Sequence, residues 1–204
     1  MNNCPATRHA PLQIFEMDRL FSGRNPSFAQ NDIDLRIVSC YNLSKQQLEK
    51  VSLDFTGGST MQFVAITAEN FEELIPLQKA YKAEIGECAP TNAELESLKK
   101  AIEDGRIHFY GCICDNSLVA CCSICYIYST FQYGTSGVFE DFYIQPEYRH
   151  KGIARMLVSY AYEQSGVGSL MVGCADCDKQ MYRAIGFQTE LGNLLALEKK
   201  QTRP

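Results

Sequence analysis

The sequence predicts an α/β fold of the α+β kind, in which helices flank a mixed central sheet on both faces. Three observations support this prediction. From Met61 onward, runs rich in Val, Ile, Tyr and Phe alternate with segments of helical period. These elements follow in the order β-α-α-β-β-β-α-β-α-β, which is typical of such layered domains. The chain has 204 residues, enough to bury a sizeable core in one domain.

The first part of the chain differs from the rest. It holds a strand-like run, Ile33–Tyr41, and then a helix expected over Lys45–Phe55 with Ser44 as its N-cap. No chemical motif lies in this segment. We therefore expect residues 1–60 to form a strand-helix extension of unknown role, packed on the main domain or on a second subunit in a homodimer. The main domain is expected to span residues 61–199.

The main domain opens with a strand and two helices. Met61–Thr67 is strand-like, and Asn70–Ala83 carries apolar residues at helical spacing. Thr91 is the expected N-cap of the second helix, which runs to about Asp104. Glu94, three positions after Thr91, completes a capping box.

The rest of the domain is expected to contain a hairpin and then alternating strands and helices. The hairpin covers Ile107–Tyr128 and turns at Asp115-Asn116-Ser117. The later elements are each bounded by Gly or Pro residues. They are a strand Val138–Gln145, a helix Gly152–Gln164, a strand Ser169–Ala175, a short helix Lys179–Ile185 and a last strand Leu194–Glu198.

Charge and hydropathy exclude several kinds of partner. The net charge of −5 and the pI near 5.3 argue against nucleic acid, which selects basic surfaces. No apolar run is long enough to span a bilayer, and Met1–Ala10 is too polar for a signal peptide. We expect a cytoplasmic protein with neither nucleic-acid nor membrane partners.

The ten cysteines are expected to be thiols rather than metal ligands. Half of them lie in the hairpin, where side chains alternate between faces, so Cys122 and Cys125 point in opposite directions. Cys174 and Cys177 follow a strand, but no His lies nearby to complete a zinc site. Small buried thiols in a reducing compartment are the simpler interpretation, and no metal is expected.

The segment that carries chemistry joins the strand Val138–Gln145 to the next helix. After Pro146, the turn delivers Arg149-x-x-Gly152-x-Ala154 into the first helical turn. Helix N-termini offer free amides and a positive dipole end, and small residues let a bulky anion approach the main chain. Basic residues at 149–151 and 155 add local positive charge. The pattern predicts a pyrophosphate site, although neither a Rossmann fingerprint nor a P-loop is present.

This segment resembles motif A of the GNAT superfamily of acyl-CoA N-acyltransferases. The family pattern is Arg/Gln-x-x-Gly-x-Gly/Ala, filled here by Arg149, Gly152 and Ala154. The lead-in positions of the motif are filled by Ile144, Pro146 and Tyr148. Downstream, 178–187 resembles the second landmark of the family, a short helix that ends in Tyr-x-x-x-Gly-Phe. The resemblance covers about two thirds of the chain.

The resemblance implies a site for acetyl-CoA. Coenzyme A would lie between two splayed strands, with its pantetheine along the main chain of 142–144 and its pyrophosphate on the amides of 150–154. The loop before the second landmark has Ala175 where many members have Asn, and Asp176 beside it. The implied cofactor-binding residues are Phe142, Tyr143, Ile144, Arg149, His150, Lys151, Gly152, Ile153, Ala154 and Asp176.

The resemblance also implies catalytic roles. Tyr182 occupies the position of the acid that protonates the departing thiolate, the alternative being that it only packs in the core. The run from Glu140 is similar to the Glu-Asp-Phe-Phe-Val of spermidine/spermine acetyltransferases, in which the glutamate is a base through water. The alternative for Glu140 is a surface carboxylate. Glu140 and Asp141 are strand neighbours, so they are expected to face opposite sides.

The expected reaction is acetyl transfer to a primary amine of a small molecule or peptide. No cysteine is recognisably paired with His9, His108 or His150, so we expect direct attack without a covalent enzyme intermediate. Glu84 and Glu87 would suit a cationic amine, or would simply belong to a solvated loop. The alternative function is a catalytically idle acyl-CoA-binding regulatory module or an assembly module.

Overall fold

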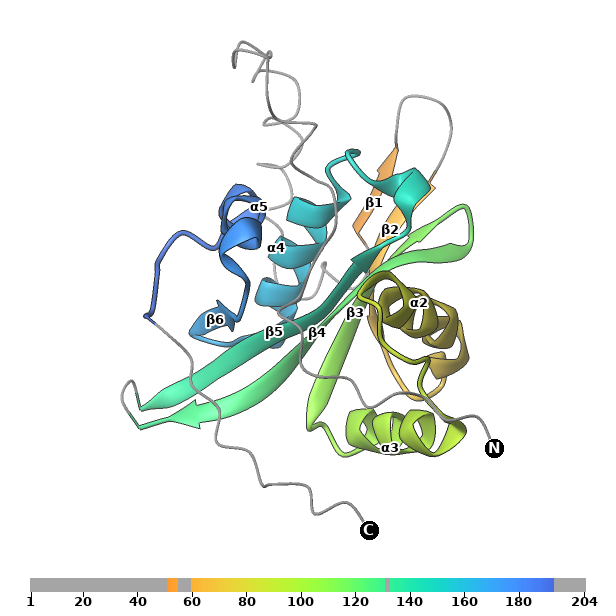
Figure 1. Cartoon of the computed structure of the whole chain (residues 1–204), viewed down its shortest axis with the longest axis horizontal. Coiled ribbons are helices and arrows are strands. Elements are labelled where there is room, and N and C mark those ends of the chain that lie inside the picture. Colours follow the sequence, from red (N-terminus) through yellow and green to blue (C-terminus); the bar gives the residue numbers. More distant parts are fainter. Residues whose placement is uncertain (1–50, 55–59, 131–132, 193–204) are drawn as a thin grey trace.

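A single six-stranded sheet forms the centre of the molecule in the computed structural model, which describes residues 51–54, 60–130 and 133–192 (Figure 1). The strands lie in chain order across the sheet. They are β1 (Val51–Asp54), β2 (Thr60–Ile66), β3 (Ile107–Cys114), β4 (Ser117–Ser129), β5 (Gly134–Ile144) and β6 (Ser169–Val172). Neighbouring strands are antiparallel except β5 and β6, which are parallel. The prediction of a mixed sheet is confirmed.

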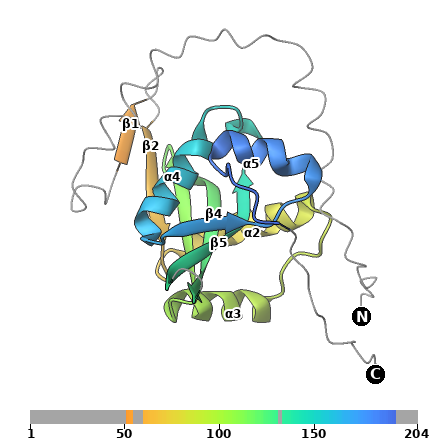
Figure 2. The same ribbon diagram turned by 90° about the vertical axis from the view of Figure 1, so that its left-hand side faces the viewer.

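Helices cover both faces of this sheet (Figures 1 and 2). The helices are α2 (Phe71–Glu84), α3 (Asn92–Glu103), α4 (Ile153–Ser165) and α5 (Lys179–Ile185), with single 3₁₀ turns at Pro146–Tyr148 and Asp176–Asp178. Helices α2 and α3 pack on one face, around Leu74, Leu77 and Phe109. Helices α4 and α5 pack on the other, around Leu157 and Phe139. We call these the α2 face and the α4 face.

Local sequence signals explain where the first two helices begin. Thr91 forms the predicted capping box, because its hydroxyl accepts the Glu94 amide and the Glu94 carboxylate accepts the Thr91 amide at 2.7 Å. Before α2, the Asn70 side chain accepts the amide of Thr67 at 2.7 Å. Pro76 lies inside α2 and removes one helical hydrogen bond, yet the helix continues to Glu84.

One expected element of the extension is wrong where the structure describes it. Val51–Asp54 lies within the helix expected over residues 45–55, but it forms β1 and pairs antiparallel with β2. The sequence Val-Ser-Leu-Asp alternates apolar and polar residues, the period of a strand, and the edge of β2 offers main-chain partners. The rest of that helix and the strands expected at 33–41 and 194–198 lie outside the described residues.

The described cysteines agree with most of the thiol prediction. Seven of them carry thiols, and Cys112, Cys114, Cys121 and Cys122 are buried in the sheet. Cys88 is the exception, because it is disulfide-bonded; it is exposed in the connection after α2. No group of three or more His, Cys, Asp or Glu side chains in the described chain is arranged to hold a metal ion.

The described part of the chain contains no helix with the length and apolar character needed to cross a membrane.

Candidate active site

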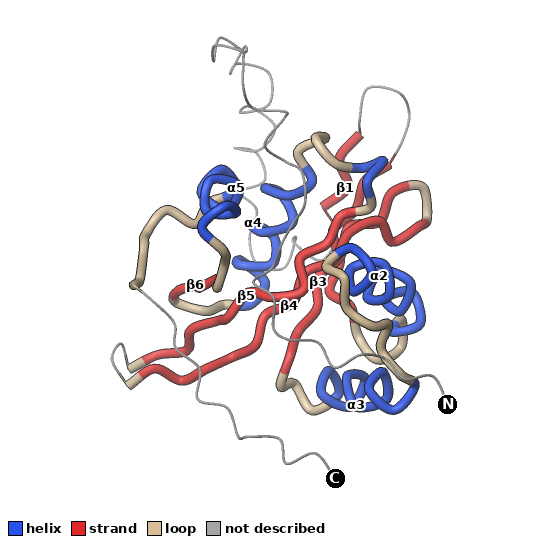
Figure 3. Tube along the Cα trace, in the orientation of Figure 1, coloured by secondary structure: helices blue, strands red, loops and turns tan. Residues whose placement is uncertain are grey.

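The main chain at the end of β5 is open along one edge. Strand β6 pairs with β5 only as far as Phe139, which lies opposite Val172. Beyond that point β5 continues to Ile144, and within the described part of the chain residues 140–144 pair with no strand on the β6 side (Figure 3). A strand edge with free amides and carbonyls can pair with the amides of an extended ligand.

A β-bulge interrupts this part of β5. On the β4 side, Ser123 lies opposite Glu140 and Cys121 lies opposite Tyr143. Two β5 residues, at 141 and 142, therefore oppose one β4 residue, and Asp141 takes a left-handed φ of 49°. The bulge re-aims the side chains that follow it and breaks the strand alternation.

The bulge corrects the prediction that Glu140 and Asp141 face opposite sides. The Glu140 carboxylate accepts the Cys125 thiol, and Asp141 lies beside the Ser123 hydroxyl. Ser123 and Cys125 alternate with Ile124 of the α4 face, so they share the face on which Cys121 packs with α2. They therefore lie together on the α2 face. In a regular strand the next side chain would point to the other face, but the extra residue of the bulge leaves both side chains on the same face.

The two carboxylates differ in their environments. Glu140 is exposed, and its Oε2 accepts the Cys125 thiol at 3.5 Å. Burial raises the pKa of Asp141, while Lys82 lowers it and Glu140 raises it further. The Ser123 hydroxyl is fully buried beside Asp141 and favours its charged form, although its geometry does not amount to a full hydrogen bond.

Tyr182 reaches the same region from α5. Its ring packs edge-on against Phe187, with 5.7 Å between the centroids. Burial raises the pKa of the Tyr182 phenol, and Tyr81 adds to the rise. Burial, followed by Asp141, raises the pKa of Tyr81 to about 12. The Tyr81 phenol thus lies near enough to both Asp141 and Tyr182 for their charges to interact.

Sequence reasoning missed Tyr81 as a member of the site. Its spacing in α2 makes it look like one more residue of the apolar stripe. The signal that could have identified it is its position in the last turn of the helix, next to Lys82 and three residues before Glu84.

The turn after β5 exposes the start of α4 as predicted. His150 has a φ of 60° and Gly152 a φ of 80°, so the chain turns sharply before the helix. Gly152 is the N-cap and has no side chain with which to cap α4. The first-turn amides are therefore available to an anion. His150 and Lys151 are exposed nearby, and the Lys151 ammonium lies 5.0 Å from the Tyr148 ring centroid.

Two arginines of this motif bind protein groups. The Arg149 Nε donates to the Ile144 carbonyl at 2.8 Å, and its Nη2 pairs with the Glu84 carboxylate. Arg155 donates to the Ala184 carbonyl at 2.8 Å and so ties α4 to α5. Their guanidinium groups bind protein carbonyls and a carboxylate, whereas the sequence predicted that they would supply positive charge near a bound phosphate.

The other predicted cofactor residues offer mainly their main chain. Phe142 packs on Phe139, Tyr143 is buried on the α2 face, and Ile144 is buried on the α4 face. Ile153 is buried and Ala154 is half-buried at the start of α4. Asp176 lies after β6, where its 94 % exposed side chain pairs with Lys179 at 2.9 Å.

Glu84 at the end of α2 and Glu87 just after the helix are both in ion pairs. Glu84 binds Arg149, and Glu87 accepts Lys82 at 2.7 Å. Glu84 therefore already neutralises a cation of the protein, and the carboxylate whose charge acts on the Tyr182 phenol is that of Asp178.

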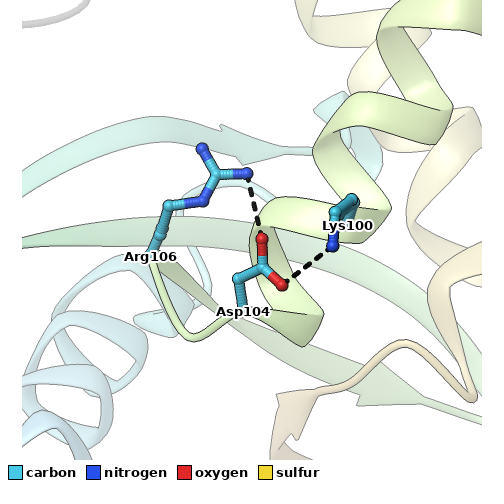
Figure 4. A network of polar contacts seen from close by, with 3 residues as sticks. All are labelled: Lys100, Asp104 and Arg106. Atoms are coloured by element: carbon cyan, nitrogen blue, oxygen red, sulfur yellow. Dashed lines mark hydrogen bonds and ion pairs between the residues drawn. The ribbon is translucent and has the colours of Figure 1, made fainter.

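Two surface hollows lie away from these residues. One, of about 490 Å³, is lined by α3 and Arg106, and the other, of about 400 Å³, lies between the end of α3 and strands β2 and β3. In the first, Lys100 and Arg106 both pair with Asp104, at 3.1 and 3.5 Å (Figure 4). These pairs close the C-terminal end of α3.

Comparison with known proteins identifies the fold and the family of the site. Residues 105–189 match the acetyltransferase (GNAT) domain. This range contains the β5 bulge, the α4 turn and Tyr182. No curated protein matches the sequence.

Several solved structures share the fold. A possible acetyltransferase from Clostridium difficile 630 superposes with a TM-score of 0.60 at 16% identity, over 68% of this chain and 97% of that one. A predicted acetyltransferase with acetyl-CoA from Clostridium acetobutylicum gives 0.55 at 15% identity, over 67% and 96%. An aminoglycoside acetyltransferase from an uncultured soil metagenomic sample, in complex with sisomicin, gives 0.60 at 12% identity, over 68% and 95%.

The family match, the shared fold and the open β5 edge beside an uncapped helix agree with one another. Residues 105–189 therefore carry an acetyltransferase (GNAT) domain, a family whose acyl donor is acetyl-CoA.

Proposed function

We propose that this protein acetylates a primary amine of a small molecule or peptide by direct attack on the acetyl-CoA thioester. The observation that carries the proposal is the β5 bulge. At the bulge, two carboxylates, Glu140 and Asp141, lie next to a strand edge that pairs with no other described strand, and both act on Tyr81 of α2.

The cofactor would bind through the main chain. Its pyrophosphate would lie on the amides of 150–154 at the uncapped start of α4, and its pantetheine along 142–144 of β5. A β5 amide would then donate to the thioester carbonyl. Such a donor stabilises the developing oxyanion by about 3 kcal/mol.

Proton transfer would involve one group on each side of the reacting carbon. Glu140 would take a proton from the amine through water, the amine nitrogen would bond to the acetyl carbon, and the carbon–sulfur bond would break. Tyr182 would give its proton to the departing thiolate. A phenol whose pKa is raised by burial stays protonated at neutral pH and remains ready to donate.

The charge of the site favours a cationic acceptor. The bulge carboxylates lie together, and Lys82 is the cation that acts on Asp141. The sisomicin complex of an aminoglycoside acetyltransferase with this fold supports a small-molecule amine as acceptor. A cytoplasmic location and a possible homodimer also belong to this proposal, the first supported by the seven thiols of the described chain.

An acetyl-CoA consumption screen tests the proposal. It would cover polyamines, aminoglycosides, amino acids and peptide N-termini, with Glu140→Gln beside the wild-type protein. We expect one amine class to be acetylated, and we expect Glu140→Gln to lose the rise in rate with pH that a carboxylate base gives. A trapped acetyl-cysteine would overturn direct attack, and no turnover with any amine would favour an idle acyl-CoA-binding module.

A further inference from the structure

The Arg149 side chain connects three parts of the site. Its Nε donates to the Ile144 carbonyl at the end of β5, its Nη2 binds Glu84 at the end of α2, and its guanidinium lies 5.7 Å from the Tyr143 ring centroid. The main chain of Arg149 begins the turn that leads to α4. The Arg149 side chain therefore joins the end of β5 to α2, and its main chain begins the turn to α4.

The Glu84 end of this connection belongs to the helical turn that faces the carboxylates. Tyr81 and Lys82 lie in the same last turn of α2. Asp141 acts on Tyr81, and Lys82 acts on Asp141. Tyr81 also packs near Tyr143, with 6.4 Å between ring centroids. A contact that holds Glu84 in place therefore also holds Tyr81 and Lys82, on the side of the site that an amine would approach.

We propose that Arg149 is a positioning residue that couples acetyl-CoA binding to the acceptor side of the site through Glu84. Acetyl-CoA on the amides next to Arg149 holds the turn, the turn holds the guanidinium, and the guanidinium holds the last turn of α2. The cofactor thereby prepares the place where the amine binds. The acceptor half of this inference rests on the proposed function.

The chemistry of arginine suits this role. A guanidinium is a planar fork that can donate to a carbonyl and a carboxylate in fixed directions, whereas a lysine ammonium is a single point charge. The side chains of Arg149 and Glu84 are 32 % and 37 % exposed, so water screens their attraction. The geometry of the link, more than its strength, is what it contributes.

Hydrogen exchange on the full-length protein tests the coupling without any acceptor. We expect coenzyme A to slow amide exchange in 81–86 of wild-type α2 by about tenfold, and Glu84→Gln to abolish this protection. Coenzyme A affinity, measured by calorimetry, should stay within twofold. Glu190→Gln is the matched control, because it removes an exposed ion pair with Arg183 elsewhere and should keep the protection.

Two results would overturn the coupling. One is protection of α2 that persists in Glu84→Gln. The other combines two observations: Arg149→Lys loses tenfold or more in coenzyme A affinity, and α2 of Glu84→Gln is still protected by coenzyme A. The guanidinium would then act on the phosphates of the cofactor and not through Glu84.

Kinetics test the acceptor half. With the best amine from the screen, Glu84→Gln should raise the KM for the amine about tenfold and leave the KM for acetyl-CoA unchanged. An equal rise in both constants would indicate a general structural defect and contradict the coupling. If no amine is turned over, the proposed function fails, whereas the exchange experiment still decides the coupling.

Discussion

Asp141 shows how one residue can carry both strain and charge. Its backbone is in the left-handed region, where Asp and Asn are more acceptable than most residues, and its carboxyl is largely buried. Strained, poorly solvated residues cluster at functional sites. The cost of keeping Asp141 charged should therefore appear in the stability of the protein.

Replacing this carboxylate should stabilise the fold in a pH-dependent way. The pKa of Asp141 is higher in the native state than in the unfolded chain. The protonated carboxyl therefore stabilises the fold in acid, and this stability is lost as pH rises from the ordinary aspartate range through the native pKa. Asp141→Asn, which keeps the left-handed backbone, should raise the melting temperature at neutral pH and lose this advantage in acid. Asp115→Asn is the control, since Asp115 has a φ of 48° but is exposed. The same pH trend in both variants would refute the argument.

Tyr182 offers a kinetic test at the same scale. Tyr182→Phe keeps the ring that packs on Phe187 and removes the proton donor. It should lower kcat by roughly 100-fold and change the KM for acetyl-CoA little, because the proton is needed only as the thiolate leaves. Steady-state kinetics with the best amine would measure this. Tyr128→Phe, on an exposed tyrosine, should have no effect. An undiminished kcat in Tyr182→Phe would remove the acid role.

At the scale of the element, the two ends of α4 make a matched pair. Gly152 and Gly166 both have left-handed φ angles, 80° and 64°, and neither is crowded by neighbouring atoms. Any side chain at either position costs about 1–2 kcal/mol of backbone strain. Gly152→Glu also places a bulky anion on the uncapped amides, so coenzyme A affinity by calorimetry should fall at least 100-fold. Gly166→Glu should bind normally, and equal losses in both variants would contradict the pyrophosphate site.

Most of the elements could be predicted from the sequence, but the geometry at the site could not. The strands and helices from β2 to α5 follow from periodicity, Gly and Pro boundaries and one capping box. The bulge leaves no trace in an alternating pattern, so alternation predicts that Glu140 and Asp141 face opposite sides, whereas they share one. The partners of Arg149 lie far apart in sequence: Glu84 is 65 residues away, and only the packing of α2 brings it near.

At the scale of the whole molecule, β1 extends the sheet beyond the domain boundary at residue 61 that the sequence predicts. A chain that begins at residue 61 lacks β1 and leaves the β2 edge unpaired. Its melting temperature should fall by roughly 4–8 °C relative to a chain that begins at residue 46, on the basis of about 2 kcal/mol of lost edge pairing. Scanning calorimetry would measure this, with light scattering to detect self-association through the exposed edge. Equal melting temperatures would show that β1 adds nothing to the fold.

The reactivity of the buried cysteines of β3 and β4 can be used to measure global unfolding of the sheet. Burial raises the pKa of the Cys112, Cys121 and Cys122 thiols, so the native chain hides them from alkylating reagents both sterically and chemically. Exposed Cys177 reacts in every state and supplies an internal reference. Pulsed iodoacetamide labelling, followed by mass spectrometry, would therefore count how often the whole sheet opens, in crude lysate and without any engineered probe.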